Sequence, residues 1–171
     1  MTTPREYFIY LLEGFKRELE LQRELLDAAR KKQDLLLKND IEALVPLLEQ
    51  EENLVFRTCS VEKRLKNIWK ELSERFFPDA GDMSLSKIIE LASDDIRGEF
   101  QKVQEELTKV VQELRELNHQ NAILIEDILN YISVVFSLLL REVERQENPY
   151  GTFCRDFPGG NTRGVLIDGV V

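Results

Sequence analysis

Residues 96–143 read IRGEFQKVQEELTKVVQELRELNHQNAILIEDILNYISVVFSLLLREV, and this stretch decides the fold. Its apolar residues recur at largely alternating steps of three and four, which is typical of the seam of a coiled coil or a long helical bundle. The stripe consists of Ile96, Phe100, Val103, Leu107, Val110, Leu114, Leu117, Leu124, Ile128, Val135 and Leu139. The pattern predicts one long helix over residues 95–146 that packs against other helices.

A pair of asparagines interrupts this stripe near its middle. Asn121 fills the gap between Leu117 and Leu124, and Asn118 lies one turn before it. One interpretation is that Asn121, at a seam position, fixes the register of the helices at a cost in stability. The other is that Asn118 and Asn121 present their side-chain amides to a protein partner. The residues alone favour neither interpretation.

Residues 131–140 differ from the rest of the stripe, because they are apolar on nearly every face. At about 1.5 Å per residue, the helix 95–146 would reach about 78 Å, whereas the helices predicted beside it are on the order of 50–55 Å long. Its surplus would expose a large apolar patch in a soluble monomer. A break near Asn130, pairing of two chains or docking of a partner helix would each cover that patch. We expect residues 132–140 to form a homodimer surface in the free protein, for which a helical partner competes.

Two long helices are predicted before this stretch, over residues 4–38 and 41–77, because both segments carry apolar residues at helical spacing. The only turn residues between them are Asn39 and Asp40, and so short a connection places the two helices antiparallel as neighbours. Pro46 lies inside the second pattern, where it should kink the helix or restart it.

The remaining segments complete an all-α architecture. A cluster of Pro, Gly and Asp at residues 78–82 ends the second helix, and residues 84–93 support a short connecting helix. After residue 147 helical periodicity is lost and glycines become frequent. We therefore expect an elongated antiparallel bundle of three long helices plus one short helix in residues 1–147, followed by a flexible tail in residues 148–171.

Charge and composition narrow the function. The net charge is −9 and the isoelectric point is about 4.8, which argues against a nucleic-acid partner because phosphate binding requires a basic face. The most apolar run, residues 122–140, contains Glu126 and Asp127, so no stable membrane insertion is expected. The N-terminus lacks the features of a signal peptide, which predicts a cytoplasmic protein. Cys59 lies in a helical pattern and is expected to be buried or half-buried.

No set of residues for catalysis, metal binding or cofactor binding is apparent. The single histidine, His119, follows Glu116 at the spacing used in di-iron helical bundles, but those sites need this motif twice together with two further glutamates. Nucleophilic catalysis would need a set of partners around the same histidine. We therefore predict a protein that is not an enzyme and that holds no metal and no cofactor.

The arrangement resembles the FlgN family of flagellar export chaperones over about residues 3–151. The most specific part is the segment 114–125, with the pattern Leu-x-x-Leu-Asn-x-x-Asn-x-x-Leu-Ile, followed by an apolar helix and then by Tyr150 and Gly151. The two Leu-rich helices joined at residues 39–40 and the short helix at Ser84 also fit the family. A proline at position 46 departs from the family pattern.

This resemblance implies a cytoplasmic chaperone of type III flagellar export. Such proteins bind the C-terminal helices of hook–filament junction proteins, which are hook-associated proteins, prevent their premature polymerisation and deliver them to the membrane export gate. Tyr150 and Gly151 would then dock at the export-gate component. The client-binding candidates are Asn118, Asn121, Leu124, Ile128, Ile132, Val135, Phe136 and Leu139. The alternative is a structural coiled-coil adaptor or assembly subunit in which residues 131–140 form a permanent oligomer seam.

Overall fold

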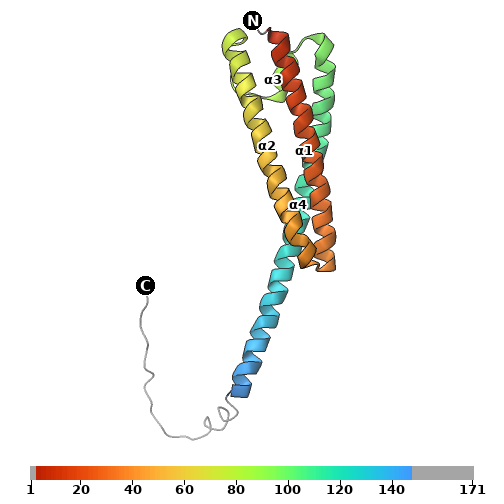
Figure 1. Ribbon diagram of the computed structural model, residues 1–171, viewed down its shortest axis with the longest axis vertical. Coiled ribbons are helices and arrows are strands. Elements are labelled where there is room, and N and C mark those ends of the chain that lie inside the picture. Colours follow the sequence, from red (N-terminus) through yellow and green to blue (C-terminus); the bar gives the residue numbers. More distant parts are fainter. Residues whose placement is uncertain (1–2, 148–171) are drawn as a thin grey trace, which may run out of the picture. The chain divides into compact units, whose positions relative to one another are not determined.

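The computed structural model describes residues 3–147, and these form helices without any strand (Figure 1). The all-α prediction is confirmed, as is the number of long and short helices. The elements are α1 (Pro4–Lys38), α2 (Ile41–Phe76), α3 (Leu85–Leu91) and α4 (Asp94–Glu147). The helix predicted over residues 95–146 is therefore continuous. The predicted tail, residues 148–171, lies outside the described residues.

The chain divides into two units at a point inside α4. The first ends at Asp127 and the second begins at Ile128. The first unit contains α1, α2, α3 and the beginning of α4, and the second contains the remainder of α4. Nothing in the periodicity of the sequence marks this boundary, because the helical pattern runs through it unbroken.

Side-chain caps fix where the first two helices begin and end. The hydroxyl of Thr3 accepts a hydrogen bond from the backbone N–H of Glu6, and the Glu6 carboxylate accepts one from the Thr3 N–H at 2.8 Å. At the turn, Asn39 adopts a left-handed conformation with φ 54°. The Asp40 carboxylate then accepts from the Ala43 N–H at 3.1 Å and starts α2. This two-residue turn places α1 and α2 antiparallel (Figure 1).

Two local predictions for α2 are wrong, namely a restart of the helix at Pro46 and burial of Cys59, whereas a kink at Pro46 stays a prediction. The helix does not restart at Pro46 but continues through it. Pro46 lies in the second turn and is exposed, so it removes only one backbone hydrogen bond, at a place that water can reach. Cys59, expected to be at least half-buried, is exposed. The helical stripe that contains Cys59 is therefore distinct from the one that faces α1.

A regular series of ion pairs sets the register of α1 against α4. The three pairs join residues that are each 83 positions apart, and successive pairs are seven residues apart along both helices. A constant offset requires the two helices to run parallel, and the seven-residue repeat is that of a coiled coil. The pairs are Lys16–Glu99, Arg23–Glu106 and Arg30–Glu113. Because all six side chains are about half exposed, these pairs specify register more than they add stability.

The main core of the first unit lies where α3 meets the other helices. Phe15 and Phe100 pack edge to face with ring centroids 6.4 Å apart, and Phe100 is completely buried. Trp69 is buried, and its indole N–H donates to the Gly81 carbonyl at 3.1 Å. A smaller cluster, nearer the turn, holds α1 against α2 through Leu21, Ala28, Leu47 and Leu54.

Candidate functional site

The structure places Asn121 inside the contact between α1 and α4. Its side chain is 1% exposed, and the amide Nδ2 donates to the backbone carbonyl of Ala29 at 2.9 Å. The buried Oδ1 has no hydrogen-bond partner among residues 3–147. The hydrogen bond from Nδ2 to Ala29 forms only when the helices stand in one register, so its position favours the interpretation that Asn121 fixes register.

Asn118 and Asn121 do not share a surface. Asn118 is exposed, whereas Asn121 is buried. His119 and Glu116 are also exposed, and the part of the chain that the structure describes holds no group of three His, Cys, Asp or Glu side chains placed to bind a metal. Leu124, the next candidate along the first unit, is half-buried.

The second unit carries the apolar candidates. Ile128 is half-buried, and every described side chain from Leu129 to Glu142 is exposed. At 100° per residue, five of the candidates fall on one side of the helix. They are Ile128, Ile132, Val135, Phe136 and Leu139, and we call them the C-terminal apolar surface. The exposed fractions of the last four are 55%, 36%, 61% and 60%.

The opposite side of the same helix is polar. Ser133 and Ser137 lie one turn apart there, and the Ser137 hydroxyl donates to the Val134 carbonyl at 2.8 Å. The helix is therefore amphipathic, although its apolar arc is wide and also includes Tyr131, Val134, Leu138 and Leu140.

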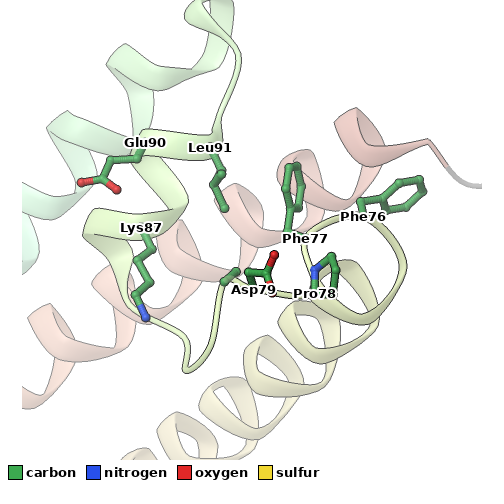
Figure 2. Close-up of a pocket in the computed structure, with 8 residues that line it drawn as sticks. Phe76, Phe77, Pro78, Asp79, Lys87, Glu90 and Leu91 are labelled. Carbon is green, nitrogen blue, oxygen red and sulfur yellow. The ribbon is translucent and has the colours of Figure 1, made fainter.

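A separate pocket of about 480 Å³ lies in the first unit, at the end of α2 (Figure 2). The turn after α2 and the short helix α3 form its walls, which are lined by Phe76, Phe77, Pro78, Asp79, Ala80, Lys87, Glu90 and Leu91. The Lys87 ammonium donates to the Asp82 carbonyl at 3.2 Å. The lining has no nucleophile beside a base, and none of the predicted site residues belongs to it.

Comparison with known families decides the identity. The family described as FlgN protein matches residues 1–152, which is most of the chain. The chain belongs to the FlgN family. No curated protein and no solved structure matches it.

FlgN proteins are flagellar export chaperones without enzymatic activity, they are cytoplasmic, and their partners are hook-associated proteins. The matched region includes both asparagines, the whole C-terminal apolar surface and also Tyr150 and Gly151, which lie outside the described residues.

The exposed apolar part of α4 in this FlgN chain bears on the expectation that the protein does not insert stably into a membrane. Within Asp94–Glu142, one stretch is apolar and not buried, so by length and composition alone this helix could cross a membrane. One such helix does not establish a membrane span, because the core helix of a soluble protein can have the same length and composition. The exposed apolar side chains therefore need an explanation by binding, whether to protein or to lipid.

Proposed function

We propose that this chain is the chaperone for helical C-terminal regions of hook–filament junction proteins, and that the C-terminal apolar surface binds them. A single observation carries the proposal: five apolar side chains at helical spacing lie on one side of α4, and four of them are at least 36% exposed. An amphipathic helix presented in this way is a common element of helix recognition, since a partner helix can bury the same spacing of side chains.

Binding by this surface would explain how the client is kept from polymerising. A client helix that is covered along its apolar face cannot use that face to join another subunit. We further propose that the free chaperone covers Ile132, Val135 and Leu139 by self-association through residues 132–140, and that the client competes for them. Glu126 and Asp127, both exposed and both within the apolar run 122–140, support a protein partner and no stable membrane insertion, because a spanning helix would place two carboxylates in hydrocarbon.

The two asparagines take different roles in this proposal. We assign Asn121 to helix register, because its amide donates to the Ala29 carbonyl inside the first unit. Asn118, which is exposed, and Leu124, which is half-buried, remain candidates for client contact. Their contribution is a prediction that substitution at each position would test.

The test of the proposal is a pair of matched double variants in the full chain. Val135→Asp with Leu139→Asp places two carboxylates on the C-terminal apolar surface, whereas Ser133→Asp with Ser137→Asp places them one turn apart on the polar side. A synthetic peptide with the C-terminal helix of a hook-associated protein is titrated into each. We expect the first variant to lose binding and the second to keep it, with circular dichroism showing both folded. Equal binding by both variants would overturn the proposal.

The same titration separates a chaperone from a permanent structural adaptor. If the surface serves a chaperone, the peptide should convert self-associated chain into a one-to-one complex, as seen by light scattering. An adaptor seam would keep its mass when the peptide is added.

Docking at the export gate is proposed for Tyr150 and Gly151 on the basis of family resemblance. Tyr150→Ala should impair export of the client from cells and leave peptide binding unchanged. Loss of peptide binding as well would show that Tyr150 belongs to the client site.

A further inference from the structure

Helix α2 carries a second stripe, on a different side from the residues that it buries against α1. The buried side consists of Leu47, Leu54, Thr58 and Leu65. The second stripe recurs every 3.6 residues along the exposed side, and we call it the outer α2 stripe. It consists of Ile41, Val45, Leu48, Glu52, Val55, Phe56, Cys59, Lys63, Lys66 and Lys70, all of which are exposed.

Packing within the first unit does not account for the apolar part of this stripe. Phe56 is 73% exposed, the highest value among the large apolar side chains that the structure describes. Val45, Leu48 and Val55 are between 45% and 54% exposed. Single exposed apolar residues are ordinary, but four within three turns of one helix side form a continuous patch.

Charge is distributed unevenly along the stripe. Glu52 lies within its first half and Glu49 at its edge, whereas the second half carries Lys63 and Lys66. Among the described residues, none of these four takes part in an ion pair. Glu52 precedes the midpoint between Phe56 and Cys59 by as many residues as Lys63 follows it. The same relation holds between Glu49 and Lys66. The charges of the stripe are thus complementary when one copy is reversed, and Val45 and Leu48 then lie against the aliphatic stems of lysines in the second half.

We propose that the outer α2 stripe binds the same stripe of a second copy of this chain, antiparallel, about a two-fold axis between Phe56 and Cys59. In this arrangement Glu52 faces Lys63 of the second copy, and Glu49 lies close to Lys63 and Lys66 of that copy. Phe56 packs against Cys59 and Val55 across the axis. A parallel arrangement would oppose like charges, so charge selects the antiparallel one. Because a two-fold axis repeats each contact, every favourable pair occurs twice.

The size of the stripe sets the strength of this dimer. Residues 41–70 extend for about 45 Å, but only one helix side contributes from each copy. The buried area therefore falls at or below the lower limit of about 1,200 Å² for stable complexes, and the dimer should be weak and dependent on concentration. Its exposed ion pairs should also make it dependent on ionic strength. This inference is independent of the client proposal, because the two surfaces share no residue.

The test is a charge exchange in the full chain. Val135→Asp with Leu139→Asp is kept in every sample, so that self-association through residues 132–140 does not contribute. Sedimentation equilibrium at low ionic strength then compares this parent with Glu52→Lys, with Lys63→Glu and with both substitutions together. Each single substitution should weaken dimerisation roughly tenfold or more, because two ion pairs become two repulsions. The double substitution should restore most of it, since the pair between positions 52 and 63 is re-formed with its charges exchanged and only the attraction between Glu49 and position 63 stays lost.

Two controls separate specific pairing from general charge effects and from unfolding. Glu105→Lys on α4 changes the net charge as much as Glu52→Lys does, at an exposed position away from the stripe, and should leave dimerisation unchanged. Phe56→Ser should abolish dimerisation at every salt concentration while circular dichroism remains that of the parent. A parent that stays monomeric at low ionic strength, or a double exchange that restores nothing, would overturn the inference.

Discussion

The two ends of α4 differ in a way that apolar content alone does not predict. Between Asp94 and Asp127 the helix is rich in Glu, Lys and Gln, yet Ile96, Phe100 and Val103 are buried. From Leu129 to Leu140 apolar residues dominate, yet all of these side chains are exposed. The apolar side chains of the first stretch are buried because α1 packs beside that stretch in a fixed register. A stretch that is more apolar and still exposed is what the proposed client surface requires.

The largest difference between the two stretches should appear when a phenylalanine is removed from each. Phe100→Ala should lower the free energy of unfolding by about 3–5 kcal/mol, because Phe100 is completely buried against Phe15. Phe136→Ala, at a position 61% exposed, should change it by no more than about 0.5 kcal/mol. Urea unfolding followed by circular dichroism measures both. Similar losses would show that the second stretch belongs to the folded core.

A second prediction concerns how closely the first unit is packed. A Cβ at Gly14 would lie 2.5 Å from Cδ2 of Leu65, so Gly14→Ala should cost about 1–3 kcal/mol despite the better helix propensity of alanine. Gly98 on α4 has nothing within 4 Å of such a Cβ, and Gly98→Ala should instead stabilise the protein by up to about 1 kcal/mol. Thermal unfolding gives the sign for each variant. Stabilisation by both would mean that α1 and α2 can separate at little cost.

Substitution of Asn121 tests whether the buried part of α4 also contacts the client. Asn121→Leu removes a buried oxygen that has no hydrogen-bond partner among residues 3–147, so it should raise the free energy of unfolding by about 1 kcal/mol. Client-peptide binding should remain as in the unmodified chain. If the variant is folded but no longer binds the peptide, then the amide contacts the client and the register interpretation is insufficient.

The smallest effect is expected at Glu18, on the partly buried side of α1. Burial raises the pKa of the Glu18 carboxyl, and the nearby charge of Glu62 raises it further. The folded state therefore binds this proton more tightly than the unfolded state, and stability falls as pH rises through the interval between the ordinary and the raised pKa. Glu18→Gln should be slightly more stable than the unmodified chain at neutral pH and no more stable at pH values below that interval.

This prediction is checked by urea unfolding at a series of pH values, with Glu13→Gln on the exposed side of α1 as the control. A gain from Glu18→Gln that is the same at every pH would exclude the carboxyl as its cause.

Much of the fold was predictable because it depends on local signals. The short connection at Asn39 and Asp40 places two helices antiparallel wherever it occurs, and periodicity over dozens of residues defines a helix reliably. The prediction for Cys59 failed because helical spacing does not say which of two stripes on α2 faces α1. Client contact by Asn118, Leu124 and the C-terminal apolar surface remains a prediction from sequence and resemblance.

The sequence by itself thus determined four helices, their order, the antiparallel hairpin and membership of the FlgN family, since each follows from residue types at fixed spacing along the chain. Only the tertiary structure decided which apolar stripe is buried, because burial depends on which residues of another helix pack against the stripe. Two kinds of contact fix the register of α1 against α4. They are the ion pairs from Lys16–Glu99 to Arg30–Glu113, which repeat every seven residues, and the Asn121–Ala29 hydrogen bond. They join residues more than eighty positions apart, and a register between segments so distant is a property of packing rather than of local sequence.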